Sequence, residues 1–170
     1  MKRVLLVTAM LVLVASAAAQ TSLKVGANAP DFSSISLDGD QYELGKLRGT
    51  VVVLSFWSTK CEICRAELPK LNKLAAQFDG GEKVVFLAPT MENDNIVNAF
   101  VRRNPVKFEI LADNFGLLLQ YADRTKDGSL DMGFPSFFVI DQNGIIQYRA
   151  SGYGRVEPLT KAIDRLVAKN

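Results

Sequence analysis

Residues 51–69 read VVVLSFWSTKCEICRAELP, and this stretch decides the fold. The run Val51–Phe56 is almost continuously apolar and rich in β-branched residues, which predicts a strand buried on both faces. The polar residues 58–60 then end the strand. From Cys61 onward, apolar residues recur every three or four positions, which is the spacing of a helix with one buried face. The predicted order is therefore a buried strand, a short polar loop and a helix that begins at a cysteine.

Cys61 and Cys64 lie two residues apart at the start of this predicted helix. The unpaired N–H groups and the positive end of the helix dipole favour an anion there, so Cys61 should ionise more readily than a free thiol. A thiolate attacks disulfides, and the spacing allows Cys64 to attack the resulting mixed disulfide. We therefore expect Cys61 to be the nucleophile and Cys64 the resolving thiol.

The numbers of cysteines and histidines limit the kinds of site that Cys61 and Cys64 can form. The chain has two cysteines and no histidine. A structural zinc site needs four ligands, so we expect no metal, and the missing histidine also excludes Ser/His/Asp and Cys/His catalysis. A purely structural disulfide is the remaining alternative, although so short a loop would constrain little chain entropy. We expect a redox dithiol that needs no cofactor.

The segment FWSTKCEICRAELP resembles the active-site segment of the TlpA/ResA-like thiol-disulfide oxidoreductases of the thioredoxin superfamily. Three positions depart from that motif: Lys60 stands where a second Trp is usual, Ile63 where Pro is usual, and Ser55 where thioredoxin has a buried Asp. The resemblance implies a thioredoxin-like α/β fold, with a mixed central sheet flanked by helices and an N-terminal β-hairpin. The matching positions are Phe56, Trp57, Thr59, Cys61, Cys64, Glu67 and Pro69.

Three side chains around the cysteines gain roles from this resemblance. Glu92 takes the place of a glutamate held near the two sulfurs, where a carboxylate would disfavour a thiolate and could carry a proton to Cys64. Alternatively, Glu92 simply begins a solvated helix. Trp57 would help to shape the site, and we expect both Trp57 and Lys60 to contact the substrate. Lys60 would favour the thiolate of Cys61, unless it is an ordinary surface lysine.

A late proline completes the predicted site. Pro135 comes directly before an apolar run, and the superfamily places a cis-proline loop against its two cysteines. The resemblance gives Pro135 that role, with an ordinary trans turn proline as the alternative. The backbone of Phe134 would then be free to pair with the extended chain of a partner, as in strand addition.

The rest of the chain supplies a frame for this site. Asp-Gly at residues 38–39 and the DQNG sequence at residues 141–144 predict two hairpins. Val84–Ala88 predicts a second buried strand, parallel to the first. Apolar spacing over Val156–Leu166 predicts an amphipathic C-terminal helix. The polar residues 122–132 predict a long loop, which either recognises a partner or is a plain solvated insertion.

The N-terminus has the three parts of a secretory signal. Residues 1–19 comprise a basic start, an apolar run of eleven residues and a series of small residues suited to cleavage. We expect a signal peptide, with an uncleaved anchor as the alternative, followed by one domain over residues 25–170. Without Lys2 and Arg3, 18 basic and 18 acidic residues remain, so the charge balance offers no footprint for nucleic acid.

The resemblance implies an exported, monomeric oxidoreductase that reduces disulfides of periplasmic client proteins, as in cytochrome c maturation, and draws electrons from a membrane thiol donor. Two alternatives remain. A peroxiredoxin-like peroxide reductase shares the hairpin and strand patterns, but Ser58 and Leu54 stand where that family needs Thr and Pro. A non-enzymatic binding module with a residual disulfide is the other alternative.

Overall fold

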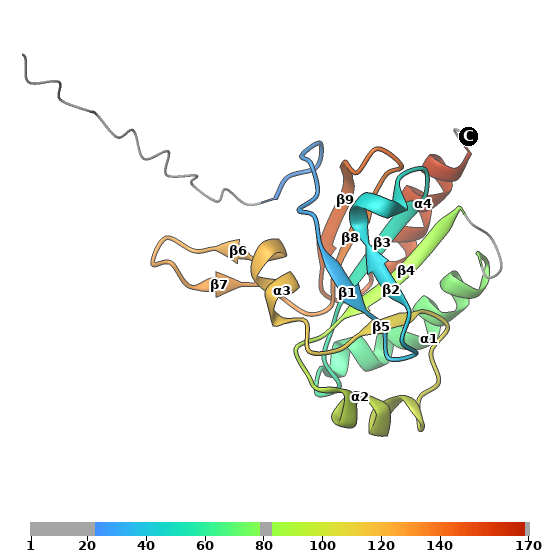
Figure 1. The fold of residues 1–170 in the computed structure, drawn as a ribbon, viewed down its shortest axis with the longest axis vertical. Helices are drawn as coiled ribbons and strands as arrows, with labels where there is room; N and C mark the ends of the chain where they lie inside the picture. Colours follow the sequence, from blue (N-terminus) through green and yellow to red (C-terminus); the bar gives the residue numbers. More distant parts are fainter. Residues whose placement is uncertain (1–22, 79–82, 169–170) are drawn as a thin grey trace, which may run out of the picture.

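The centre of the molecule is a five-stranded mixed sheet of order β5-β4-β3-β8-β9 (Figure 1). The computed structural model describes residues 23–78 and 83–168, so the predicted signal peptide at residues 1–19 lies outside the described part. All six residues of the middle strand are buried, as the sequence predicted. The strands are β3 (Val51–Phe56), β4 (Val84–Pro89), β5 (Glu109–Leu111), β8 (Ser136–Ile140) and β9 (Ile146–Ser151).

Strand pairing fixes the edge of the sheet at which chemistry can occur. Strand β3 pairs in parallel with β4 and antiparallel with β8, and β4 pairs in parallel with β5. Strands β8 and β9 form the second predicted hairpin. Because β3 and β4 are parallel, their carboxyl ends lie at the same edge, where the polar loop after β3 begins. In sheets of this kind, ligands bind beyond the carboxyl ends of the strands.

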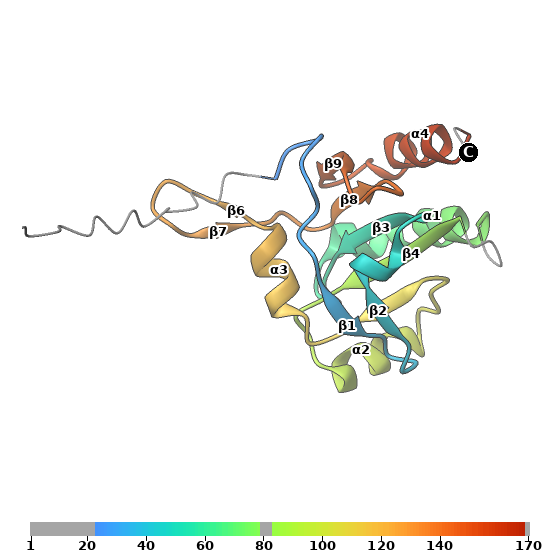
Figure 2. The ribbon, with the colours of Figure 1, turned by 45° about the horizontal axis from the view of Figure 1, so that its top comes forward.

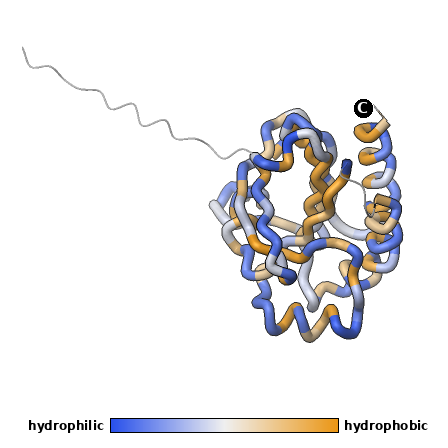
Figure 3. Tube along the Cα trace, turned by 45° about the vertical axis from the view of Figure 1, so that its right-hand side comes forward, coloured by the Kyte–Doolittle hydropathy of each residue, from blue (hydrophilic) through white to orange (hydrophobic). Residues whose placement is uncertain are grey.

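Both faces of the sheet are covered. Helices α1 (Glu62–Ala76) and α4 (Val156–Val167) pack on the face that carries Val51 and Val53. Helix α3 (Phe115–Tyr121) and the N-terminal segment pack on the face that carries Val52 and Leu54. This alternation explains the continuous apolar run of β3, because each face buries every second side chain. Figure 3 shows the alternating hydropathy of the C-terminal helix.

Smaller elements complete the frame. The predicted N-terminal hairpin is present as β1 (Ser33–Ile35) and β2 (Gln41–Glu43), followed by a short 3-10 helix, η1 (Leu44–Leu47). Helix α2 (Asp94–Val101) is followed by hydrogen bonds from the N–H groups of residues 102–104 to the helix carbonyls.

The segment 122–132 differs from its prediction. It is a β-hairpin of β6 (Asp123–Arg124) and β7 (Leu130–Asp131), which projects from the body of the molecule (Figures 1 and 2). The prediction of a loop was wrong because two-residue strands of polar composition give no hydrophobic alternation. An Asp-Gly turn, in which Gly128 has a φ of 85°, closes the hairpin, and an ion pair from Arg149 to Asp123 ties its base to β9.

Candidate active site

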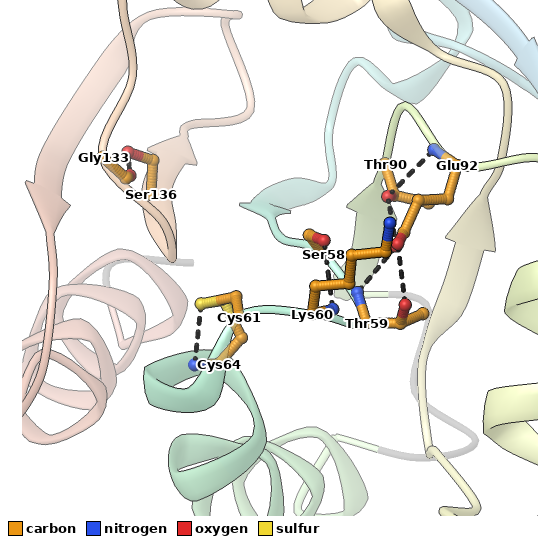
Figure 4. Close-up of a disulfide and its surroundings, with 9 residues drawn as sticks. All are labelled: Ser58, Thr59, Lys60, Cys61, Cys64, Thr90, Glu92, Gly133 and Ser136. Carbon is orange, nitrogen blue, oxygen red and sulfur yellow. Dashed lines mark hydrogen bonds between the residues drawn. A yellow bond between two sulfur atoms is a disulfide. The ribbon is translucent and has the colours of Figure 1, made fainter.

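Cys61 is the residue that caps the N-terminus of helix α1. The backbone N–H of Cys64, in the first turn, donates a hydrogen bond to the sulfur of Cys61 over 3.0 Å. The two residues form a disulfide, and their Cα atoms lie 5.2 Å apart. Figure 4 shows the pair where the polar loop of residues 58–60 enters the helix. The sulfur of Cys61 therefore occupies the position in which a helix N-terminus stabilises negative charge.

The two cysteine residues differ in exposure. The Cys61 residue is partly exposed, whereas Cys64 is only 7% exposed. Cys64 packs in an apolar cluster with Trp57, Ala88 and Val97, at the carboxyl ends of β3 and β4. An incoming disulfide can therefore reach Cys61 more readily than Cys64, and Cys64 lies behind it.

Trp57 forms a wall of this apolar cluster. Its ring N–H donates to the carbonyl of Ala88 over 3.2 Å, and its ring centroid lies 5.3 Å from that of Phe100. The residue is 5% exposed, so it shapes the site from behind the disulfide. Lys60 is exposed, directly before Cys61. The expected contacts of both side chains with a substrate stay predictions.

Glu92 reaches across from the segment after β4 to the loop after β3 (Figure 4). Its carboxylate accepts hydrogen bonds from the N–H of Thr59 at 2.6 Å and from the Thr59 hydroxyl at 2.7 Å. The hydroxyl of Thr90 lies 3.4 Å from the same carboxylate. These contacts hold the backbone two residues before Cys61. The expected transfer of a proton between Glu92 and Cys64 stays a prediction.

Pro135 lies beside Cys64. The Phe134–Pro135 peptide bond is cis, and Pro135 lines one small cavity together with Cys64. The carbonyl of Pro135 accepts a hydrogen bond from the N–H of Gly152 over 2.9 Å, which ties this loop to the end of β9. Phe134 is partly buried against the apolar cluster. Its pairing with a partner chain stays a prediction.

A buried carboxylate lies behind Cys64, at Glu67, a position that matches the motif but received no role from the sequence. Glu67 is 2% exposed, and its carboxylate accepts a hydrogen bond from the Lys70 ammonium over 2.9 Å. Among the described residues, none donates a hydrogen bond to the second oxygen, Oε2. Glu67 and Cys64 line the same cavity of about 20 Å³, which has room for one water molecule. Their spacing of three residues was the available signal, because it places two side chains on one face of a helix.

The family follows from a comparison with known proteins. The family model described as Redoxin matches residues 24–163, which is most of the chain. The chain belongs to the redoxin family. This redoxin is 31% identical to the thioredoxin-like protein YneN of Bacillus subtilis over 130 residues, which cover 75% of the chain and 72% of YneN.

Other relatives carry names that describe their chemistry. This redoxin is 26% identical, over 147 residues, to the thiol-disulfide oxidoreductase ResA of Bacillus thuringiensis, covering 86% of the chain and 81% of ResA. A putative thiol:disulfide interchange protein DsbE from Chlorobium tepidum superposes with a TM-score of 0.69 at 24% identity, covering 87% of the chain and 98% of that structure. The fold of this redoxin is therefore thioredoxin-like, as predicted.

The described residues offer neither a cluster of metal-binding side chains nor a helix that could cross a membrane. Within residues 23–78 and 83–168, no three His, Cys, Asp or Glu side chains gather where they could hold a metal ion. In the same two ranges, no helix combines the length and the apolar character that crossing a membrane requires.

Proposed function

We propose that this redoxin is an exported oxidoreductase that reduces disulfides of client proteins through Cys61 and Cys64. One observation carries the proposal: the partly exposed residue Cys61 caps helix α1 with its sulfur, while the buried residue Cys64 is bonded to that sulfur from behind. A structural disulfide needs no such asymmetry. A thiol that attacks a large partner must be accessible, and a resolving thiol must not compete with it.

The reaction has two exchanges. The thiolate of Cys61 attacks one sulfur of the client disulfide, that S–S bond breaks, and the other client sulfur leaves as a thiolate that takes up a proton. The thiolate of Cys64 then attacks the sulfur of Cys61 and releases the second client sulfur in the same way. The client gains two electrons and two protons, and the redoxin keeps the Cys61–Cys64 disulfide until a thiol donor reduces it.

Neighbouring groups determine how the two cysteines lose their protons. In the reduced protein, the N–H groups at the start of α1 stabilise the Cys61 thiolate, and the exposed Lys60 adds positive charge. Cys64 has no such help because it is buried among apolar groups. Glu67, and not Glu92, lines the cavity of Cys64, so Glu67 takes the place of the expected Glu92 as the acceptor of the Cys64 proton, directly or through one water molecule.

The remaining predicted residues position the reacting parts. Glu92 acts on the loop before Cys61 through its two hydrogen bonds to Thr59, and therefore sets where the nucleophile lies. The loop at Phe134 and Pro135 offers backbone groups beside the disulfide to an extended client segment. Trp57 excludes water behind the sulfurs.

The proposals of export, of the client class and of the electron donor rest on the sequence and on its relatives. Residues 1–19 have the pattern of a secretory signal, and the relatives include ResA and the DsbE-like protein. A periplasmic, monomeric reductase that acts in cytochrome c maturation and is recharged by a membrane thiol protein fits both observations. The 25–170 segment is then the working domain.

Two measurements on the protein without residues 1–19 test the function. Equilibration against dithiothreitol should place the pair near the reducing end of the roughly −270 to −120 mV range of active-site dithiols. Dithiothreitol-driven reduction of a disulfide-linked polypeptide should accelerate with the wild type and not with Cys61→Ser. A strongly oxidising potential would contradict a reductase. Fast peroxide consumption that needs Cys61 but not Cys64 would point to a peroxide reductase instead.

A further inference from the structure

Two serine hydroxyls join the proline loop, residues 133–136, to the end of the neighbouring strand. Ser136 is the first residue of β8, and its register partner on β9 is Ser151, the last residue of that strand. Directly opposed residues of an antiparallel pair place their side chains on the same face of the sheet. The two hydroxyl oxygens lie 2.6 Å apart, which is a hydrogen-bond distance.

The direction of these hydrogen bonds follows from the donors that are present. The Ser136 hydroxyl donates to the carbonyl of Gly133 over 2.6 Å (Figure 4). A carbonyl can only accept and a serine hydroxyl has one proton, so Ser151 is the donor to the oxygen of Ser136. The N–H of Gly152 donates to the carbonyl of Pro135 over 2.9 Å. The contacts therefore hold Gly133 and Pro135, the two neighbours of Phe134 in the chain.

The two serines differ in exposure. Ser136 is 3% exposed, and a hydroxyl at that depth needs a hydrogen-bond partner. Ser151 is exposed at the end of β9, an edge strand of the sheet. Removal of the Ser151 hydroxyl leaves Ser136 bonded to Gly133, so that change leaves no buried hydroxyl without a partner. It detaches the proline loop from β9 at one point and keeps the core intact.

Phe134, which these contacts flank, has backbone groups available for a client. Its neighbour Pro135 lines the small cavity together with Cys64. Among the described residues, none forms a hydrogen bond with the N–H or the carbonyl of Phe134. An extended polypeptide that brings its disulfide to Cys61 can pair with these two groups, as in strand addition. A disulfide reagent that lacks a peptide backbone cannot.

We propose that Ser136 and Ser151 are positioning residues that hold the backbone of Phe134 in place for an extended client segment. This inference rests on the proposed function, and it concerns the binding of the client and not the exchange of sulfur bonds. A loop that is already fixed loses little conformational freedom when the client binds. Without the hydrogen bond from Ser151, the loop must become ordered at that moment, so the client binds more weakly.

Two substrates separate binding from chemistry. One is a peptide dimer linked by a single disulfide within an extended segment, and the other is a dithiobis-nitrobenzoate reagent, which has no peptide backbone. Turnover with dithiothreitol as the reductant gives kcat and KM for the peptide. In Ser151→Ala, we expect KM for the peptide to rise about fivefold while kcat stays unchanged. The rate at which Cys61 attacks the reagent should change less than about twofold, because that attack needs no backbone pairing.

Matched variants isolate the hydroxyl. Ser151→Thr keeps a hydroxyl at an exposed strand position and should restore the wild-type KM. Ser136→Ala removes both hydrogen bonds of its hydroxyl and should raise KM at least as much as Ser151→Ala. Ser33→Ala changes an exposed residue of β1 and should leave KM unchanged. A peptide that is N-methylated on both sides of its cysteine pairs poorly through its backbone, so Ser151→Ala should not raise its KM further. Thermal unfolding of each variant checks that the fold is kept.

Two results would overturn the inference. One is a Ser151→Ala protein whose KM for the peptide matches that of Ser33→Ala. The other is an equal loss of rate with the peptide, the methylated peptide and the aromatic reagent, because the serines would then act on Cys61 and not on the client. A wild-type protein that reduces neither the peptide nor the reagent would instead contradict the proposed function itself.

Discussion

The carboxylate of Glu92 accepts hydrogen bonds from both the N–H and the hydroxyl of Thr59, at 2.6 and 2.7 Å. This pairing joins the segments that follow β4 and β3, two residues before Cys61. Through these two hydrogen bonds, Glu92 holds the loop that carries the nucleophile.

Glu92→Gln should loosen that loop. A neutral amide is a weaker acceptor than a carboxylate, so we expect the oxidised protein to lose about 1–2 kcal/mol of unfolding free energy. Urea denaturation measures the loss. In a double-mutant cycle with Thr59→Val, the coupling energy should exceed about 0.5 kcal/mol. Additive effects would show that the pair does not act as a unit.

Trp57→Phe should lower stability by about 1–2 kcal/mol. The change removes the hydrogen bond to the carbonyl of Ala88 but keeps an aromatic ring against Phe100. Trp57 is the only tryptophan, so circular dichroism rather than intrinsic fluorescence must follow unfolding. Equal stability of the variant would mean that this hydrogen bond adds nothing.

Glu67→Met should both stabilise the fold and slow the reduction of client disulfides. The change removes a buried carboxylate whose Oε2 accepts no hydrogen bond from the described residues. Replacing such a group with an apolar side chain of similar size should raise the unfolding free energy by about 1 kcal/mol. The exposed Glu62→Met should give no such gain. A destabilised Glu67→Met would mean that its ion pair with Lys70 outweighs the desolvation of the carboxylate.

Tyr121 should make the protein sensitive to alkali. Burial raises the pKa of Tyr121 above its ordinary value of 10.0, and the Asp31 carboxylate raises it further. The unfolded chain loses this proton near pH 10 while the folded chain keeps it. Its contribution to stability is therefore complete below pH 10 and declines as the pH rises further.

Tyr121→Phe tests this sign. The variant loses the hydrogen bond from the hydroxyl to the carbonyl of Pro30, 2.9 Å long, so it should be about 1 kcal/mol less stable at pH 7. Above pH 10, its unfolding free energy should fall less steeply than that of the wild type. Parallel slopes for the variant and the wild type would contradict the assignment.

The sequence predicted most of the frame because its signals are local. A run of β-branched residues followed by helical spacing is enough to place Cys61 at the junction of β3 and α1. The hairpins at residues 38–39 and 141–144 were also predicted, since Asp-Gly and Asn-Gly select tight turns. The same Asp-Gly signal at residues 127–128 was overlooked inside a polar segment, and that hairpin was read as a loop.

The part of the site that depends on packing could not be predicted in this way. A glutamate within a helix usually lies in solvent, so the sequence gives no sign that Glu67 is buried. Glu67 is buried because it lies on the face of α1 that turns toward β3. The partner of Glu92 likewise depends on how two loops meet at the edge of the sheet. Contacts between segments distant in sequence set both roles, and periodicity does not report such contacts.

The most direct test of the account is to trap the mixed disulfide. Cys64→Ser and Cys61→Ser proteins, both without residues 1–19, are reduced, incubated with a disulfide-bearing polypeptide and quenched with acid, and the linked species are mapped by mass spectrometry. The account predicts that Cys64→Ser accumulates a conjugate through Cys61, whereas Cys61→Ser forms little or none. Equal conjugates in the two variants, or one only through Cys64, would contradict it.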